Sequence, residues 1–189
     1  DQLQPPDAQR GELHGHLSAD GAHADDRHRE LLQSGPGRRI DLAGGTLDIW
    51  PLYLFHERAQ TINAAISLRA RCTIQPRGKR GLTIVSGDTG RRVDVAHWSE
   101  LRDNHELRLL GRLLHFFQAE GLELHTRSES PMGAGIAGSS ALNIAVIGAL
   151  VAWTGQARSD AEIMQIAMNV EAQAIDVPTG VQDYRPALY

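Results

Sequence analysis

An alternating strand, a loop of glycine and serine, and an apolar helix follow one another between Leu122 and Trp153. Residues 122–127 alternate apolar and polar side chains, which predicts a strand with one face on a core. Glycines in the following loop let the backbone approach a ligand closely and adopt positive φ. The first turn of the next helix offers unpaired N–H groups and the positive end of its dipole. This order of elements predicts an anion site, and a phosphate is its natural ligand.

The three glycines within residues 133–138 also spell G-x-G-x-x-G, the pattern of dinucleotide-binding folds. Such a site also needs a buried parallel strand before the loop, a second strand after the helix and an acidic residue about 20 positions on. Here the preceding strand is half polar and a second helix follows the first. Asp160 has the right offset, but Ser159 and Glu162 form a capping box that places it in a helical turn. The context therefore argues against a dinucleotide-dependent oxidoreductase.

A P-loop is excluded because no Gly-Lys-Ser/Thr follows the glycines. Instead, Ser139 and Ser140 stand at the predicted start of the helix. A hydroxyl at this position caps the helix or binds Mg²⁺ beside a phosphate. Spacing alone leaves both roles open.

Three segments of the chain resemble the motifs of one family, the GHMP kinases, in the expected order. Pro131–Leu142 resembles the family's nucleotide loop, roughly P-x-x-x-G-L-G-S-S-A, although Ala137 and Gly138 stand where the heptose-kinase branch usually has Gly and Ser. Pro36–Pro51 is similar to the N-terminal sugar-site motif, and its Gly-Gly-x-x-Asp spacing is closest to heptose-phosphate kinases and fucokinases. Gly180–Tyr184 is similar to the catalytic aspartate motif.

The resemblance implies an α+β fold, the N-terminal ATP-binding domain of this family, with a mostly antiparallel sheet packed against helices. It implies an ATP-dependent kinase that transfers the γ-phosphoryl group to a hydroxyl of a sugar or sugar phosphate. The ATP loop would comprise Pro131, Gly133, Ala134, Gly135, Ile136, Ala137, Gly138, Ser139 and Ser140. Mg²⁺ would be held by Ser140 and Glu171, and the substrate by Gly45, Thr46, Asp48 and Gln182. Asp183 would be the catalytic base, with Arg39 holding its charge.

Each carboxylate also has an ordinary structural interpretation. Glu171 lies at the edge of the apolar stripe of a predicted helix, where a solvated glutamate is common. Asp183 follows a proline and a glycine, a setting typical of an Asx turn. Asp48 follows two glycines and could cap a turn. The alternatives at the level of function are a non-catalytic sensor of sugar and nucleotide on the kinase fold, and a mevalonate-type small-molecule kinase.

The composition limits which partners and which cellular compartment we expect. A formal charge of -4 gives no electrostatic reason to expect nucleic acid or an anionic membrane, so we expect small-molecule partners. The apolar run 141–153 is shorter than the roughly 20 residues of a bilayer span, and the N-terminus lacks the apolar region of a signal peptide. A lone cysteine excludes an internal disulfide and a cysteine-based zinc cluster. A cytoplasmic protein is the default expectation.

The chain divides into a tail and one domain. Residues 1–33 have almost no apolar periodicity and predict a disordered or loosely attached tail. Residues 34–189 would form the ATP-binding domain, and the family's second lobe would follow it, so the chain is expected to be truncated before that C-terminal lobe. Within the domain, the patterns predict one long strand over 62–74, an antiparallel meander through 82–86 and 91–95, and helices over 101–120 and 159–175.

Overall fold

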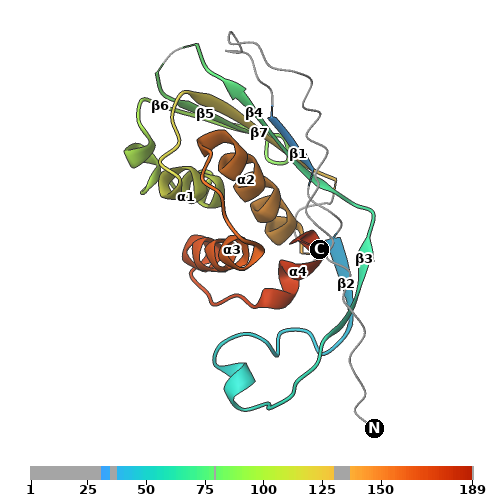
Figure 1. The fold of residues 1–189 in the computed structure, drawn as a ribbon. Helices are drawn as coiled ribbons and strands as arrows, with labels where there is room; N and C mark the ends of the chain where they lie inside the picture. The colour runs from blue at the N-terminus through green and yellow to red at the C-terminus, as the bar shows by residue number, and fades with distance from the viewer. Residues whose placement is uncertain (1–30, 35–37, 79, 130–136, 189) are drawn as a thin grey trace.

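The computed structural model describes residues 31–34, 38–78, 80–129 and 137–188, and it has two sheets and a layer of helices (Figure 1). The larger sheet has the order β1 (Leu31–Ser34), β4 (Ala70–Pro76), β7 (Leu122–Ser128), β5 (Leu82–Ser86) and β6 (Arg91–Val95). The smaller sheet pairs β2 (Arg38–Ala43) with β3 (Ile62–Ile66). The α-helices are α1 (Arg108–Phe116), α2 (Gly138–Thr154), α3 (Asp160–Ile175) and α4 (Arg185–Leu188), and the 3₁₀ turns are η1 (Leu52–Leu54), η2 (Trp98–Leu101) and η3 (Val181–Asp183).

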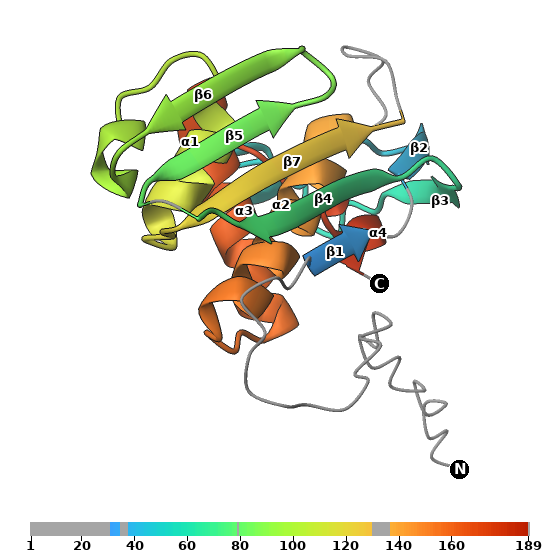
Figure 2. The ribbon, with the colours of Figure 1, turned by 90° about the horizontal axis from the view of Figure 1, so that it is seen from above.

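The predicted fold class, an α+β domain with a mostly antiparallel sheet, is confirmed. Within the described residues every strand pair is antiparallel except β5 with β7. Figure 2 shows the helices together on one face of the five-stranded sheet. Helix α2 lies across β1, β4 and β7 and is flanked by α1 and α3, so the main core lies between this helix and the sheet. No helix in the described part of the chain has the length and apolarity that a membrane crossing requires.

The prediction of a single strand over 62–74 is wrong, because the chain changes sheets between Ile66 and Ala70. In β4 the alternation holds, and Ala70, Cys72 and Ile74 are fully buried. In β3 the side chains at the corresponding even-numbered positions are not buried, and Ile62 is 59% exposed. Alternation specifies only that side chains point to opposite faces of a strand. It does not specify whether another layer lies against either face, and β3 lies outside the area that α2 covers.

The predicted meander is correct only for its second half. Strands β5 and β6 form the expected hairpin, whose turn contains Gly90 at φ +67°. Strands β4 and β5 are not neighbours, because β7 lies between them, antiparallel to β4 and parallel to β5. A turn signal predicts a change of chain direction, but the partner of a strand depends on which other strand offers a complementary buried face.

The helix predicted over 101–120 is shorter in the structure. The Asn104 side chain accepts a hydrogen bond from the Glu106 N–H (2.9 Å), and this local turn competes with a helix, so α1 begins only at Arg108. Four apolar side chains spaced three or four positions apart, as on one face of a helix, are nevertheless buried: Leu107, Leu110, Leu114 and Phe117. Helix α1 ends at Phe116, and Gly121, at φ +67°, belongs to the turn into β7.

The remaining boundaries agree more closely with the predictions. Helix α3 begins after the Ser159 capping box, and α2 ends at Thr154, followed by Gly155 in the left-handed conformation. Residues 31–33, assigned to the tail from sequence, instead form most of β1, which adds its backbone to the edge of β4. An edge strand offers unpaired N–H and C=O groups to any neighbouring segment, whatever the pattern of that segment. Residues 1–30 lie outside the described part of the chain.

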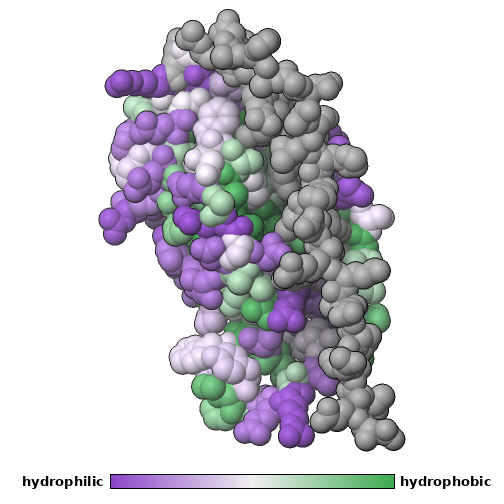
Figure 3. All heavy atoms as spheres, in the orientation of Figure 1, coloured by the Kyte–Doolittle hydropathy of each residue, from purple (hydrophilic) through white to green (hydrophobic). Residues whose placement is uncertain are grey.

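The small sheet and the loop between its strands carry exposed apolar side chains. Ile40 and Leu42 of β2 are 47% and 67% exposed, and Phe55, just after η1, is 75% exposed. Figure 3 shows hydrophobic residues on the surface beside β3 and in the loop of η1. Such side chains are favoured on a surface that another layer of protein covers.

Candidate active site

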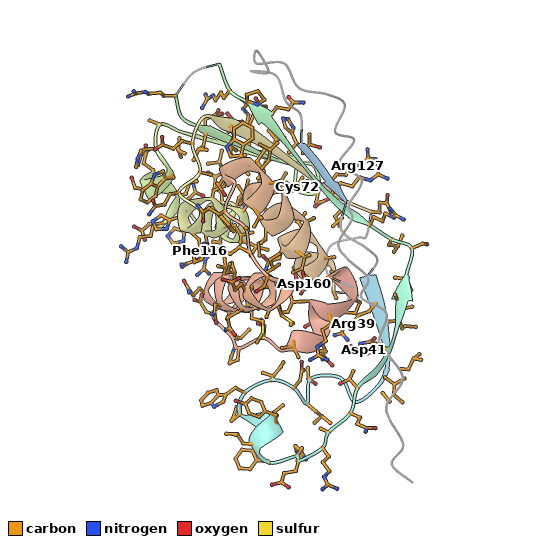
Figure 4. The ribbon with its side chains drawn as sticks, viewed as in Figure 1. Arg39, Asp41, Cys72, Phe116, Arg127 and Asp160 are labelled. Carbon is orange, nitrogen blue, oxygen red and sulfur yellow. The ribbon has the colours of Figure 1, made fainter. Side chains whose placement is uncertain are left out.

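The site lies where β2, the N-terminal half of α2, the C-terminal half of α3 and the segment 180–184 come together. These elements are far apart in the sequence, and Figure 4 shows Arg39 and Asp41 of β2 beside the α4 region. Helix α4 lies against β2, and α2 contacts both α3 and α4. The tertiary fold therefore brings three of the sequence motifs to one region.

The nucleotide loop is described only from Ala137 onward. Residues Pro131, Gly133, Ala134, Gly135 and Ile136 of the predicted ATP loop lie outside the described residues. Ala137 has φ +55° and precedes the first turn of α2, with no side-chain hydrogen bond to cap the helix. Neither Ser139 nor Ser140 therefore caps α2, which removes one of the two roles left open by the sequence. Ser139 is exposed, whereas Ser140 is 3% exposed.

Ser140 faces α3, where it meets Glu171. The Ser140 hydroxyl donates to Glu171 Oε2 at 3.3 Å. The Asn143 side-chain amide donates to the same oxygen (3.3 Å) and to the Ala167 carbonyl (2.9 Å). Glu171 is 4% exposed, so it is not the solvated glutamate that the alternative interpretation required. Among the described residues no arginine, lysine or histidine forms an ion pair with it.

This arrangement fits a magnesium ion. A buried carboxylate is costly unless a cation or hydrogen bonds compensate its charge. Glu171 has hydrogen bonds from a hydroxyl and an amide but no cation among the described residues. Mg²⁺ prefers oxygen ligands and takes one or two from the protein, leaving the others to phosphates and water. Ser140 and Glu171 offer two such oxygens next to each other.

Tyr184 is a further buried residue near Glu171 and Asp183. Its side chain is fully buried, and its hydroxyl has no hydrogen bond of good geometry within the described part of the chain. Burial raises the pKa of the Tyr184 phenol, and the negative charge of Glu171 raises it further, with a smaller contribution from Asp183. The phenol therefore stays protonated at neutral pH beside these carboxylates.

Arg39 links two carboxylates from different segments. Its NH1 donates to Asp41 Oδ1 on the same strand, and its NH2 donates to Asp183 Oδ1, 144 positions further along the chain. The Arg39 side chain is 5% exposed, so both ion pairs are shielded from water on the arginine side. The Asp183 side chain makes this long-range ion pair and forms no Asx turn among the described contacts. Arg39 and Asp183 are therefore neighbours, as predicted. Their roles, Asp183 as catalytic base and Arg39 as the residue that holds its charge, stay predictions.

Asp48 reaches the same segment as Asp183. Its Oδ2 accepts a hydrogen bond from the Gln182 backbone N–H (2.8 Å), while its Oδ1 is buried without a partner among the described residues. A Cβ at Gly180 would lie 2.3 Å from both carboxylate oxygens, so only glycine permits this approach. Asp48 therefore does not merely cap its own turn. It joins the first motif to the last.

The other predicted substrate residues differ in whether they reach the site. Gln182 is 7% exposed, and its side-chain oxygen is buried without a partner in the described region. Gly45 lies beside Asp41, since a Cβ there would be 3.3 Å from Asp41 Oδ2. Thr46 is exposed, and its hydroxyl donates to the carbonyl of Gly45, so the structure does not bring its side chain into the cluster.

Unsatisfied polar atoms concentrate in this region. Leaving a buried donor or acceptor without a partner costs about 1–3 kcal/mol, and native proteins contain few such atoms. Of the six within the described residues, all but the Thr126 hydroxyl belong to this site: Arg39 Nε, Asp48 Oδ1, Asn143 Oδ1, Gln182 Oε1 and the Tyr184 hydroxyl. Donors and acceptors of this kind are what a hydroxyl-rich ligand would satisfy.

Sequence reasoning missed three residues of the site. Asn143 could have been found, because it is the one amide within the apolar run 141–153. Asp41 could also have been found, because residues two apart on a strand share a face and Asp41 stands two positions after Arg39. Tyr184 offered no such signal.

Comparisons with known proteins agree with this fold and these motifs. The model of the family described as "GHMP kinases N terminal domain" matches residues 104–189. D-glycero-alpha-D-manno-heptose 7-phosphate kinase of Campylobacter jejuni is 31% identical over 157 residues, which is 80% of this chain and 46% of that protein. Mevalonate kinase of Methanothermobacter thermautotrophicus is 28% identical over 133 residues, which is 68% of this chain and 42% of that protein. The chain thus spans about half the length of the curated relatives it matches.

Solved structures share the fold over most of the chain. A D-glycero-D-manno-heptose 1-phosphate kinase from Bacteroides thetaiotaomicron superposes with a TM-score of 0.73 at 24% identity, covering 83% of this chain and 53% of that one. A putative sugar kinase from Campylobacter jejuni gives 0.71 at 26% identity, covering 84% and 50%. Mevalonate kinase of Methanococcus jannaschii gives 0.70 at 15% identity, covering 85% and 51%. By its family match, its relatives and its fold, the chain belongs to the GHMP kinase superfamily and spans the N-terminal part of such proteins.

Proposed function

We propose that this chain carries the catalytic site of an ATP-dependent kinase that phosphorylates a hydroxyl of a sugar or sugar phosphate. One observation carries the proposal: Arg39, Asp48 and the segment 182–183 meet across more than 130 positions of sequence and leave buried polar atoms unsatisfied. Heptose-phosphate and mevalonate kinases among the relatives support phosphoryl transfer to an alcohol. The proposed compartment is the cytoplasm. The proposed unit is the domain predicted over 34–189, extended at its start to include β1, acting with a second lobe.

The proposed reaction divides between two groups of residues. Asp183 accepts the proton of the acceptor hydroxyl as the oxygen–phosphorus bond forms and the bond between the γ-phosphorus and the bridging oxygen of ADP breaks. Arg39 stays on Asp183 and adds positive charge near the transferring group. The first turn of α2, from Gly138 to Ser140, would lie against the phosphates of ATP. Mg²⁺ held by Ser140 and Glu171 would offset phosphate charge when bound.

The charges near the acceptor favour an uncharged, hydroxyl-bearing group. Asp41 and Asp183 pair with Arg39, and Asp48 accepts from the backbone of Gln182, the neighbour of Asp183, so this region holds three carboxylates and one guanidinium. Carboxylate oxygens accept hydrogen bonds from hydroxyls and repel another anion. A sugar hydroxyl therefore fits this place better than the carboxylate of mevalonate, and the phosphate of a sugar phosphate would have to lie away from the cluster.

The proposal is tested by ADP release with Mg²⁺-ATP over a panel of acceptors: heptose phosphates, fucose, galactose and mevalonate. Both the 189-residue chain and a version extended along its natural reading frame are assayed, because the relatives are about twice as long. Sugar-dependent ADP release in the extended form is the expected result. Turnover with mevalonate alone would replace the sugar with a mevalonate-type acceptor.

Binding measurements distinguish the sensor from the enzyme. Isothermal titration with ATP and with each sugar is carried out on the same two proteins. Tight binding of both ligands without ADP release in either form would overturn the kinase in favour of a non-catalytic sensor. Absence of binding to ATP would contradict both.

A further inference from the structure

We propose that Asp41 is a positioning residue that keeps one oxygen of Asp183 free for the reacting hydroxyl. The inference deepens the proposed function and rests on it. It starts from a contact to which the motifs assign no role: Arg39 divides its terminal nitrogens between Asp41 and Asp183.

An arginine beside a single carboxylate commonly binds both of its oxygens with two parallel N–H groups. The two terminal nitrogens of Arg39 form one such fork. Asp41 Oδ1 occupies NH1, so Asp183 bonds to Arg39 through NH2 and a single oxygen, Oδ1. The other possible fork includes Nε, which is buried without a partner among the described residues, so Asp183 does not bind through that fork either.

Asp183 Oδ2 is consequently left open. Among the described residues it accepts no hydrogen bond, and 29% of the Asp183 side chain is exposed, whereas Arg39 is 5% exposed. One carboxylate oxygen is thus fixed by the buried guanidinium and the other faces accessible space. A carboxylate that accepts a proton needs this combination, because it must be oriented and still have a free lone pair.

The position of Asp41 suits this task. It lies on the same face of β2 as Arg39, where alternate side chains point the same way. Its Oδ2 faces the loop that follows, next to Gly45. The Asp41 side chain is 34% exposed, so the ion pair with Arg39 is only partly shielded and contributes orientation more than stability.

Removal of Asp41 should change the contact between Arg39 and Asp183 in a defined way. In Asp41→Ala, NH1 becomes free, and Arg39 can bind both oxygens of Asp183. Asp183 would then be a weaker base with no free oxygen. In Asp41→Asn, the amide oxygen still accepts from NH1, so the single-oxygen contact should persist.

The experiment compares crystal structures and kinetics of the wild type, Asp41→Ala, Asp41→Asn and the exposed control Asp103→Asn. We expect Arg39 to bind one oxygen of Asp183 in the wild type and both in Asp41→Ala. The kcat of Asp41→Ala should fall about tenfold, part of the range for losing acid–base catalysis, with KM within about twofold. Asp41→Asn should retain most of the kcat, and Asp103→Asn all of it.

The pH–rate profile distinguishes two roles for Asp41: controlling how Arg39 binds Asp183, or only holding Arg39 in its place. The charged or titratable groups around Asp183 are Arg39 and Asp41 on β2, Asp48 beside Gln182, Tyr184, and Glu171 on α3. If Asp183 pairs more closely with Arg39 in Asp41→Ala, the acid limb of the profile moves to lower pH. If Arg39 instead leaves its place, the acid limb moves to higher pH.

Two results would overturn the proposal: an unchanged single-oxygen contact in the Asp41→Ala structure, or an acid limb that moves to higher pH. If no protein in the set phosphorylates any acceptor, the proposed function fails, and the crystal structures still decide what Asp41 does to Asp183.

Discussion

Arg39 is almost fully buried, although arginine is among the side chains least often found inside a protein unless paired. Its two carboxylate partners explain how the charge is tolerated, because a buried cation is stable only when opposite charges and hydrogen bonds replace water. Nε, the one nitrogen with no partner among the described residues, adds to the unsatisfied atoms around it. At the scale of single residues, the site therefore combines paired charges with open hydrogen-bonding positions.

Asp183→Ala tests the catalytic assignment. Loss of a general base typically lowers turnover by about 10²- to 10⁴-fold. Among the described hydrogen bonds Asp183 contacts Arg39 and neither Ser140 nor Glu171, so ATP binding should change little. The measurement is kcat from ADP release together with the Kd for ATP from titration calorimetry. Exposed Asp103 supplies the matched control, Asp103→Asn, which should behave as the wild type. Equal turnover in Asp183→Ala would remove this residue from the mechanism.

Tyr184→Phe tests the buried phenol through the dependence of stability on pH. Because the pKa of Tyr184 is raised in the folded chain, the unfolded chain releases this proton first as the pH rises. The wild type should therefore keep its stability below about pH 10, the ordinary range for tyrosine, and lose it progressively above. Thermal denaturation between pH 8 and 11 should show a smaller loss for Tyr184→Phe. The control Tyr53→Phe, at a half-exposed tyrosine, should follow the wild type.

Helix α3 is the element whose start was predicted most directly, and the same contacts make it testable. The Ser159 side chain accepts from the Glu162 N–H, and the Glu162 carboxylate accepts from the Ser159 N–H. These bonds are local in sequence, so they depend little on the rest of the fold. They position a helix that carries Glu171 into the site.

Ser159→Ala should lower the free energy of unfolding by about 1 kcal/mol, because it removes the side-chain acceptor at the N-cap. Urea denaturation measures the change, and Ser67→Ala, at an exposed serine with no hydrogen bond among those described, is the control. The bonds to Ser159 lower the pKa of Glu162, so the contribution of that carboxylate is present at neutral pH and is lost as the pH falls through the acid range. A stability of Ser159→Ala equal to that of Ser67→Ala would contradict the role of the cap.

At the scale of the whole molecule, the five-stranded sheet holds its core between α2 and the central strands, while the small sheet projects with exposed apolar side chains. Cys72 lies at the centre of β4 and is fully buried. Its burial raises the pKa of its thiol, which disfavours the reactive thiolate. Its reactivity therefore reports on opening of the core and not on the surface.

Cys72 should react with a thiol reagent at least about a hundredfold more slowly in buffer than in denaturant, because reaction requires opening of the sheet. The rate of reaction with a chromogenic disulfide is measured across a urea series and compared with unfolding followed by circular dichroism. The variant with Cys72→Ala and Asp103→Cys provides an exposed thiol that should react at once. Rapid labelling of Cys72 without denaturant would contradict the buried position of β4.

The sequence by itself determined the features that depend on neighbouring residues. The capping box started α3, the glycine after the apolar run ended α2, and the alternation in β4 and β7 predicted which side chains are buried. Such signals arise from hydrogen bonds and side-chain directions within a few residues, so they can be read without knowing the fold. The three family motifs likewise indicated the fold class and named Arg39, Asp48 and Asp183 before their contacts were known.

Only the tertiary structure decided which segments meet. It placed β7 between β4 and β5, separated β3 from β4, and left the apolar face of the small sheet exposed. It also added Asp41, Asn143 and Tyr184 to the site and left Thr46 out of it. The physical reason is the same in each case: a local pattern determines where a side chain points, whereas strand partners, burial and charge pairing depend on groups from distant segments that only the folded chain brings into contact.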